Sequence, residues 1–267
     1  MEAIQPDLSV CLLHHDEHAG ALAGFLDSLH THADPVSFEV ILVADRPESE
    51  ELARLEHGFP DLVILESKPG EPRATAINHA LRLAQGRYFC HCAPHLLLRS
   101  RTLALLVDFL DENPDVGLAA PRIVDPDGRV LPTARTLPSL TTLLATHPFW
   151  GSRLGLASRL PIHLLADRDH LLDMEVEWLL DTLLLIRREV VEEIGLFDEG
   201  FACLFADADF CRRARQAGWH LHYLAKAVAV HTQPAPVHAL TGSRTEAGDG
   251  ARFLFKGWLS SLLSRSL

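Results

Sequence analysis

Short apolar runs alternate with helix-like segments through the first half of the chain. Continuous apolar runs of strand length indicate buried strands, and apolar residues at every third or fourth position indicate helices with one buried face. This alternation is typical of a mostly parallel sheet with helices on both faces, so the pattern predicts an α/β fold. The expected strands cover residues 8–15, 38–45, 61–67 and 87–94, and the expected helices residues 17–32, 48–59, 72–86 and 101–114.

The second half of the chain has a less regular pattern. Residues 116–131 are typical of a hairpin with DPDG at its turn, whereas residues 140–166 carry the Pro and Gly interruptions of loops and short helices. Residues 233–250 are rich in turn-forming residues. The apolar pattern indicates a strand and then a helix over residues 176–200, a short helix at residues 208–219, and a strand at the end of residues 220–231.

The last segment, residues 251–267, is amphipathic. Polar Lys256 and several serines share one face at helical spacing, with Phe253 as the exception on that side. Such a helix packs on the body of the protein or on a second subunit, or it lies on a membrane surface. The apolar face comprises Leu254, Phe255, Trp258, Leu259, Leu262 and Leu263.

The composition supports a large core. The 267 residues are 48% hydrophobic, and we expect a single domain over residues 1–267, with halves at residues 1–131 and 132–250 and the amphipathic helix at the end. The net charge of −12 disfavours a nucleic-acid partner, although a local arginine cluster can still bind a small anion. The odd number of five cysteines favours reduced thiols and a cytoplasmic location. We expect neither a signal peptide nor a membrane-spanning helix.

Two carboxylates lie close together in the stretch GFACLFADADFCRRARQAGW at residues 200–219. Asp207 and Asp209 follow Phe205 and precede a basic amphipathic run. One interpretation is structural, with both residues capping a helix. The other is chemical, with one of them acting as a general base.

Several segments are similar to the family-2 glycosyltransferases, and closest to their bacterial rhamnosyltransferase-like branch with the GT-A fold. The resemblance extends to about residue 231. It is strongest in DENPDVGLAAPRIVDPDG, in LLLIRREVVEEIGLFDEGF and in ADADFCRRARQAGWHLHYLAKAVAVH. It implies an α/β GT-A fold with an irregular second half that binds the acceptor. Enzymes of this family move a sugar from a nucleotide diphosphate to an acceptor hydroxyl.

The resemblance implies roles for two residues near the end of the matched region. FADAD resembles the family's acidic pair, with Ala206 where a glutamate often stands, so Asp207 is the expected base of an inverting transfer. Asp209 then caps or supports the helix, or belongs to the substrate site. His231 matches a family histidine that follows a strand and binds a metal ion.

The chain departs from the family pattern where the donor is expected. After the second strand, Ala44 replaces an acidic residue, so Asp45 is the expected nucleotide contact. At the usual metal-binding aspartate the chain has His95, and imidazole suits zinc or later transition ions better than the Mg²⁺ or Mn²⁺ that the resemblance implies. His95 and His231 are the expected metal ligands. A zinc site that adds Cys90 and Cys92 is a further interpretation.

Other residues are expected to contact the substrates. Arg73 lies where the family often places a basic residue that faces the nucleotide, and Asn78 follows on the same helix. Asp181 stands in an apolar run where the family has a small residue, so it needs a partner or lines a cleft. We expect Asp181 or Glu177 to contact sugar hydroxyls, with Trp178 beside them.

Two functions follow from these observations. The first is an inverting hexosyltransferase of surface polysaccharide or natural-product assembly. It would use a dTDP- or UDP-sugar and a glycan, lipid-linked or small-molecule acceptor, in the cytoplasm or at the inner membrane face. The second is a non-catalytic GT-A relative that binds a partner or a sugar. Ala44, Ala93, His95 and Ala206 favour this alternative.

Overall fold

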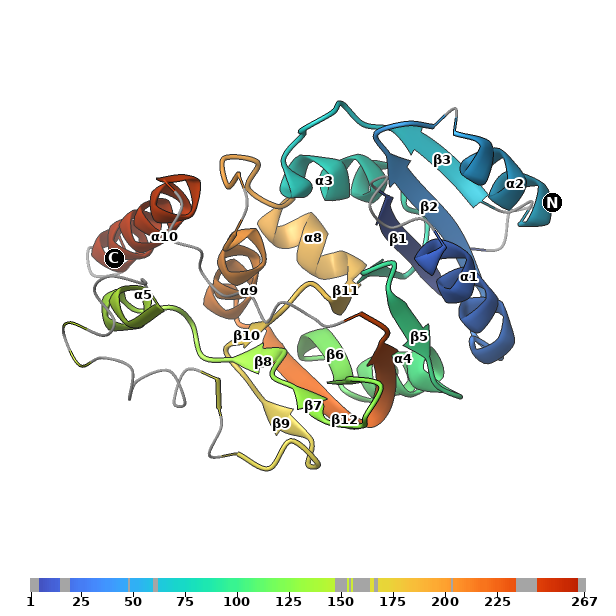
Figure 1. Cartoon of the computed structure of the whole chain (residues 1–267). Coiled ribbons are helices and arrows are strands. Elements are labelled where there is room, and N and C mark those ends of the chain that lie inside the picture. Colours follow the sequence, from blue (N-terminus) through green and yellow to red (C-terminus); the bar gives the residue numbers. More distant parts are fainter. Residues whose placement is uncertain are drawn as a thin grey trace.

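The computed structural model describes residues 5–14, 20–47, 49–59, 62–146, 153, 155, 164–165, 168–202, 204–233 and 244–263 (Figure 1). The elements of the first half are β1 Leu8–His14, α1 Ala21–His32, β2 Phe38–Ala44, α2 Glu50–Gly58, β3 Leu62–Glu66, α3 Arg73–Leu83, β4 Tyr88–Cys92, β5 Leu96–Leu98 and α4 Thr102–Glu112. Those of the second half are β6 Val116–Val124, β7 Val130–Leu131, β8 Ala134–Arg135, α5 Leu140–Thr146, β9 Met174–Glu175, β10 Trp178–Leu179, β11 Leu183–Arg187, α8 Arg188–Ile194, α9 Ala206–Gln216, β12 His220–His231 and α10 Arg244–Leu263.

A central sheet runs through the molecule in the order β3-β2-β1-β4-β11-β6-β12-β5. Strands β1 to β4 pair in parallel, as do β6 and β12, whereas β11 is antiparallel to both of its neighbours. Strands from both halves of the chain therefore share one sheet. The predicted α/β fold with a mostly parallel sheet is confirmed. The two-residue strands β8 and β10 form a separate small sheet.

Helices cover both faces of the sheet because its strands are apolar on both sides. Along β1, Val10 and Leu12 belong to the core beneath α1, α2 and α4, whereas Cys11 and Leu13 belong to the core beneath α3, α8 and α9. Strand β4 alternates in the same way, since Cys90 and Cys92 enter the first of these cores. The polar residues of interest lie on the second face.

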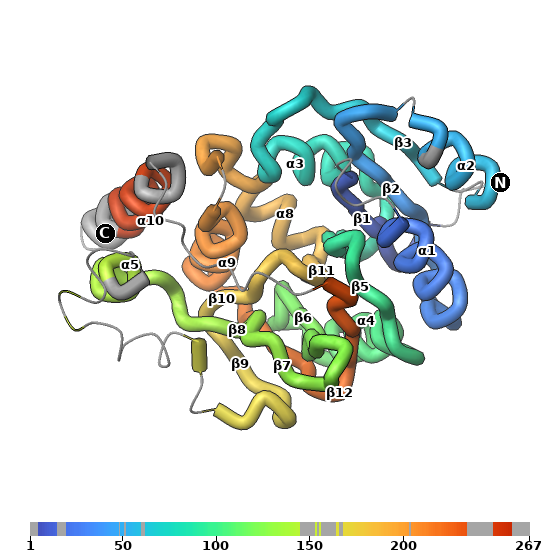
Figure 2. The backbone as a smooth tube through the Cα atoms, viewed as in Figure 1, coloured from blue at the N-terminus to red at the C-terminus, as the bar shows by residue number. Residues whose placement is uncertain are grey.

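Helix α10 packs on the body of the protein, which agrees with one of the two interpretations of the C-terminal segment. It begins at Arg244 rather than near residue 251, and it lies beside α5 (Figure 2). The structure contradicts the predicted face at two residues, because Phe253 is buried against Phe205 whereas Phe255 is 61% exposed. The side chains from Trp258 onward lie outside the described residues, as does most of the expected loop region at residues 140–166.

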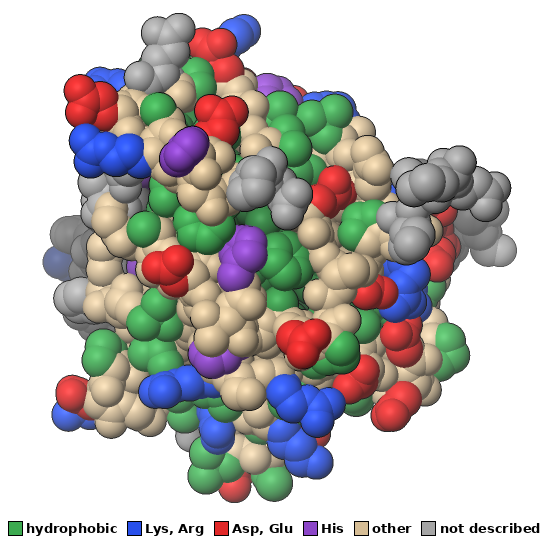
Figure 3. All heavy atoms as spheres, turned by 90° about the vertical axis from the view of Figure 1, so that its right-hand side faces the viewer, with side chains coloured by type: hydrophobic (Ala, Val, Ile, Leu, Met, Phe, Trp, Pro, Cys, Tyr) green, Lys and Arg blue, Asp and Glu red, His purple; other side chains and the backbone are tan. Residues whose placement is uncertain are grey.

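Within the described part of the chain, no helix is both long and apolar enough to cross a membrane. On the face that carries α1 and α2, acidic and basic side chains are interspersed (Figure 3).

Candidate active site

Asp207 lies in the first turn of α9, on the face of the sheet covered by α3 and α8. The helix begins after Phe205, which adopts a left-handed conformation with φ of 66° and offers no side-chain cap. The prediction that Asp209 caps this helix is therefore wrong. Asp207 is 8% exposed, and its Oδ1 accepts a hydrogen bond of 2.8 Å from the Ala208 amide.

The carboxyl group of Asp207 has an unusual acidity. Burial raises its pKa to about 7, and the negative charge of Asp181 acts in the same direction. The Ala208 amide, the Trp178 indole and the positive charge of Arg135 oppose this shift. A carboxyl group that changes its charge near neutral pH is suited to accept a proton and later release it.

Asp181 and Arg73 form an ion pair beside Asp207. Arg73 donates from Nε to Asp181 Oδ2 at 2.7 Å, across 108 residues of sequence. Its Nη2 lies 2.9 Å from His91 Nε2, on the strand β4 beneath it. Burial and the charge of Arg73 lower the pKa of His91 to about 3, so this imidazole is neutral and accepts from Arg73. The Arg73 side chain is 42% exposed and therefore open to a ligand.

Arg135 and Trp178 complete the cluster from the small sheet. They are cross-strand partners in β8 and β10, and the guanidinium carbon lies 5.3 Å from the centre of the indole ring. Burial lowers the pKa of Arg135 to about 10, and the charge of Asp207 partly offsets the effect. Neither Arg135 nor His91 was predicted from the sequence. A lone arginine in a strand of two residues and a lone histidine inside an apolar strand leave no periodic signal.

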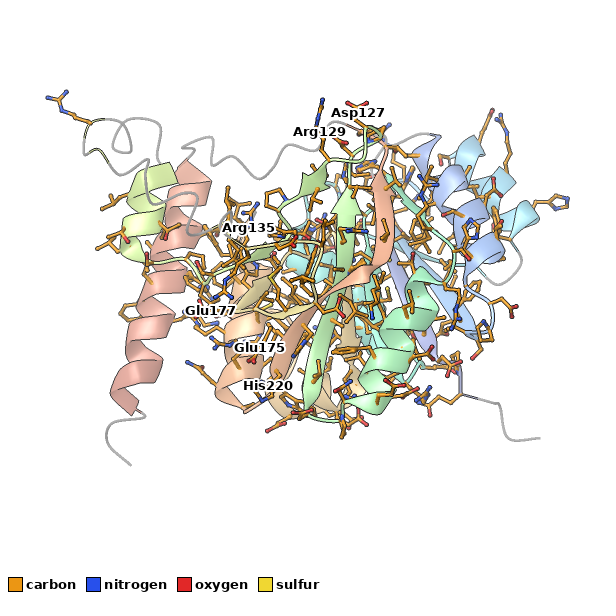
Figure 4. All side chains as sticks on the ribbon, turned by 90° about the horizontal axis from the view of Figure 1, so that it is seen from below. Asp127, Arg129, Arg135, Glu175, Glu177 and His220 are labelled. Carbon is orange, nitrogen blue, oxygen red and sulfur yellow. The ribbon has the colours of Figure 1, made fainter. Side chains whose placement is uncertain are left out.

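Glu177 supports the segment that follows Arg135. Its Oε2 accepts a hydrogen bond of 2.9 Å from the Leu137 amide, and its Oε1 lies 3.8 Å from Arg215. Figure 4 shows Arg135 and Glu177 on the side of the molecule toward α9 and α10. The structure thus brings Asp207, Asp181, Arg73 and Trp178 together, with Glu177 next to them; their expected contacts with sugars and phosphates stay predictions.

Asp209 and Asn78 make other contacts. Asp209 is fully buried and binds three cations, Arg212 at 2.6 Å and Arg213 and Lys256 at 2.9 Å. Asn78 exchanges hydrogen bonds with the backbone of Phe197 and also donates to Glu199. These contacts fix α9 against α10 and α3 against the segment after α8. Their predicted contact with substrate stays a prediction.

The residues expected at the donor end lie near the carboxyl ends of central strands. Asp45 directly follows β2 and is partly buried. His95 precedes β5 and His231 ends β12, and antiparallel pairing of these strands brings the two imidazole rings to 5.5 Å between centroids. The Thr232 amide donates to the His95 carbonyl at 2.9 Å, which holds the two segments together.

The histidine pair fits some metal ions better than others. His231 Nδ1 lies 2.7 Å from the Gln233 carbonyl, so it carries the proton and leaves Nε2 as the electron-pair donor, an arrangement common in metal-binding histidines. Two imidazoles suit zinc or a later transition ion, whereas Mg²⁺ prefers oxygen ligands. In the described residues no three His, Cys, Asp or Glu side chains gather as metal ligands. The four-ligand zinc site is therefore wrong, although Cys90 Sγ and Cys92 Sγ do lie together at 3.4 Å.

Several solved structures have a similar arrangement of elements. The chain is similar to mannosyltransferase PcManGT from Pyrobaculum calidifontis in complex with GDP-Man and Mn²⁺, with a TM-score of 0.59 and 20% identity over 88% of this chain and 59% of that one. It is also similar to GalNAc-T7 with UDP, GalNAc and Mn²⁺, with a TM-score of 0.66 and 16% identity over 93% of this chain and 47% of that one. For S. aureus TarS 1-349 the TM-score is 0.57, with 16% identity over 85% of this chain and 61% of that one.

These structures define the class: the protein has the GT-A fold of glycosyltransferases. Residues 9–195, more than half of the chain, match the family described as "Glycosyl transferase family 2", and residues 176–246 match "Glycosyltransferase like family 2". The chain belongs to glycosyl transferase family 2, and the predicted resemblance is confirmed.

Two curated relatives, from two strains of Mycobacterium tuberculosis, are named N-acetylglucosaminyl-diphospho-decaprenol L-rhamnosyltransferase. Each is 34% identical to this chain over 131 residues. The match covers 47% of this chain and 40% of the relative, so it spans less than half of either protein.

Proposed function

We propose that the protein is an inverting glycosyltransferase that moves a sugar from a nucleotide diphosphate to a hydroxyl group of a lipid-linked sugar. The observation that carries the proposal is the buried Asp207 carboxyl group, whose pKa lies near 7 beside Arg73 and Asp181. Membership of family 2 and the name of the matched relatives support the reaction class and the kind of acceptor. A dTDP- or UDP-sugar is the proposed donor.

In this mechanism the ionised Asp207 accepts the proton of the acceptor hydroxyl. The acceptor oxygen attacks the anomeric carbon from the side opposite the leaving group, so the new glycosidic bond has inverted stereochemistry. The bond from the anomeric carbon to the phosphate oxygen breaks, and its electron pair leaves with the nucleoside diphosphate. Asp207 then gives its proton to solvent.

The exposed guanidinium of Arg73 is placed to bind an anionic or hydroxyl oxygen of the donor while Asp181 keeps it oriented. The Trp178 indole lowers the pKa of Asp207 and offers an aromatic face within the cluster. The protein would work in the cytoplasm, at the inner face of the membrane that holds its acceptor.

A divalent cation at His95 and His231 would offset the charge of the leaving diphosphate. The Mn²⁺ in two of the similar structures supports a cation, and the two imidazoles favour zinc or cobalt over magnesium. We expect His95→Asp to shift the preference of UDP or dTDP binding toward Mn²⁺ and Mg²⁺, as measured by calorimetry with each ion and with chelator. His79→Asp on α3 is the matched control, and equal ion preference in the wild type and the His95 variant would argue against this site.

The proposed function is tested by donor binding and turnover. We would titrate the protein with a panel of nucleotide sugars and then measure release of nucleoside diphosphate with a lipid-diphosphate acceptor. Tight binding of one donor, and release that depends on the acceptor, support the proposal. Failure of every donor to bind, under every metal condition, would reject it.

A second candidate function is that of a non-catalytic sugar-binding or scaffold protein. It is favoured by Ala44, His95 and Ala206, which stand where the family pattern has acidic residues. The same titration separates the two functions, because a scaffold of this kind releases no nucleoside diphosphate even where it binds a sugar.

A further inference from the structure

Arg135 is a buried cation without a full set of hydrogen bonds. Its residue is 4% exposed, its Nε donates to the Pro132 carbonyl at 3.2 Å, and one face of the guanidinium covers the Trp178 indole. The Nη2 atom is buried, and no described residue accepts a hydrogen bond from it. Burial of a guanidinium is costly unless a counter-ion compensates it. A bound anion that accepts a hydrogen bond from Arg135 would reduce this cost.

A second buried polar atom without a hydrogen-bond partner lies two residues earlier in the chain. Thr133 Oγ1 is buried and has no hydrogen-bond partner within the described residues. The Thr133 carbonyl accepts from the Leu180 amide at 2.9 Å, directly beside the pairing of β8 with β10. Residues 133 and 135 are two positions apart, and side chains at that spacing on a strand face the same way. A buried hydroxyl and a buried guanidinium nitrogen of this segment therefore both lack a hydrogen-bond partner among the described residues.

The location of these two groups assigns them to the acceptor rather than to the donor. Arg135 is close enough to Asp207 for its charge to affect the carboxyl group, yet the two form no described hydrogen bond. Figure 1 places β8 and β10 apart from β5, on the other side of β6. The histidine pair expected near the donor diphosphate lies at β5. An anion at Arg135 therefore lies beside the candidate base, where the attacking hydroxyl must also lie.

We propose that Arg135 and Thr133 form an anion subsite that binds a phosphate of the acceptor close to its attacking hydroxyl. The inference rests on the proposed function and specifies which groups recognise the acceptor. The chain leads from Arg135 to the surface at Leu140, which is 59% exposed at the start of α5. The phosphate belongs either to a lipid diphosphate or to a free sugar phosphate.

The first test uses the wild-type protein and three acceptors that share one sugar. These are N-acetylglucosamine 1-phosphate, N-acetylglucosamine diphosphate on a short polyprenyl chain, and the uncharged methyl glycoside. We expect kcat/KM to be at least about tenfold higher for a phosphorylated acceptor than for the methyl glycoside, as a charge-assisted hydrogen bond implies. The ratio between the two phosphorylated acceptors distinguishes a free phosphate from a lipid-linked one. Equal kcat/KM for all three acceptors overturns the proposal.

The second test removes the cation. Arg135→Gln should lower kcat/KM for the phosphorylated acceptors about tenfold to a hundredfold more than for the methyl glycoside, whose smaller loss reports the effect of the missing charge on Asp207. Arg135→Lys should recover part of the loss. Arg129→Gln, at the exposed tip of the hairpin in Figure 4, is the matched control for loss of an arginine. An equal loss on charged and uncharged acceptors shows that Arg135 acts through Asp207 instead, and overturns the subsite.

The subsite is also tested separately from the reaction. If no donor supports release of nucleoside diphosphate, the proposed function fails, but binding of N-acetylglucosamine 1-phosphate to the wild type still reports on Arg135. Calorimetry should show binding that the methyl glycoside lacks and that Arg135→Lys weakens. Absence of any binding difference between the two sugars, at concentrations that saturate neither, counts against the subsite even then.

Discussion

At the scale of single residues, the site is governed by the unequal sharing of positive charge between two carboxylates. Asp181 has Arg73 within 2.7 Å and is satisfied, whereas Asp207 has Arg135 only at longer range. Burial therefore dominates at Asp207 and raises its pKa, although both residues are aspartates in the same cluster. The two aspartates therefore have different roles: Asp181 holds Arg73, and Asp207 exchanges a proton.

Replacement of Asp181 should change the pH dependence of the reaction. Because Asp207 works as a base in its ionised form, kcat/KM should rise with pH through about 7. Asp181→Asn removes a negative charge that raises the pKa of Asp207 and releases the charge of Arg73, so both effects lower that pKa. We expect the acid limb of the pH–rate profile to move to lower pH. The control is Glu175→Gln, because Glu175 pairs with His220 at the surface, and it should leave the pH–rate profile unchanged. An acid limb that does not move in Asp181→Asn would contradict the role of Asp181.

The buried Asp207 should also cost stability at high pH. Its pKa in the folded protein, about 7, exceeds the ordinary 3.8, so the folded state binds the proton more tightly than the unfolded chain does. Stability should therefore fall as pH rises between about 4 and 7, because ionisation of this carboxyl group then favours the unfolded chain. Asp207→Asn removes this penalty. Its thermal unfolding temperature should exceed that of the wild type more at pH 8 than at pH 5, and a difference that does not grow with pH would show that the carboxyl group is solvated.

At the scale of elements, α10 is fixed to α9 directly behind the candidate base. Lys256 bridges Asp198 at 2.7 Å and the buried Asp209 at 2.9 Å, and Arg252 also binds Asp198. Arg212 of α9 donates to the Phe253 carbonyl of α10 at 2.7 Å. Since Asp209 is two residues from Asp207, this network determines where the first turn of α9 lies.

Loss of the Asp209 charge should therefore destabilise the protein strongly. Asp209→Asn leaves Arg212, Arg213 and Lys256 without the carboxylate that they share, which costs about 3–5 kcal/mol for a buried pair. Denaturant unfolding measures this loss. Asp108→Asn removes an exposed partner of Arg101 and should change the free energy of unfolding by less than about 0.5 kcal/mol. A similar small effect in Asp209→Asn would mean that the network does not hold α9.

At the scale of the whole molecule, the first half of the fold could be predicted because its elements are long and periodic. Helix α3 follows Pro72 and ends before Gly86, and β4 is a continuous apolar run, so both appeared close to their expected bounds. Strands β8 and β10 have two residues each, which is too short for any period to show. The early start of α10 could not be predicted because residues 233–250 are rich in turn-forming residues. The burial of Phe253 could not be predicted because this residue is a single apolar side chain on the polar face.

The site was predictable only in part, for a similar reason. Asp207 stood out between aromatic residues and a helix start, and Asp181 as a charge in an apolar run, whereas Arg73 was expected only from the family resemblance. Their meeting depends on the sheet, since Arg73 and Asp181 are 108 residues apart in the sequence and come together because α3 packs on β1 and β2 of the sheet that β11 joins. His91 and Arg135 are single polar residues within apolar strands, and only the three-dimensional structure shows that they face the same cluster.

The most direct test of the account is the rate of sugar transfer by Asp207→Asn with the donor that the wild type binds. The amide has nearly the shape of the carboxylate and cannot take the proton, so kcat should fall by about 10²- to 10⁴-fold while the dissociation constant of the nucleoside diphosphate stays the same. A variant that binds the nucleotide normally and transfers sugar at the full rate would contradict the assignment of Asp207 as the base.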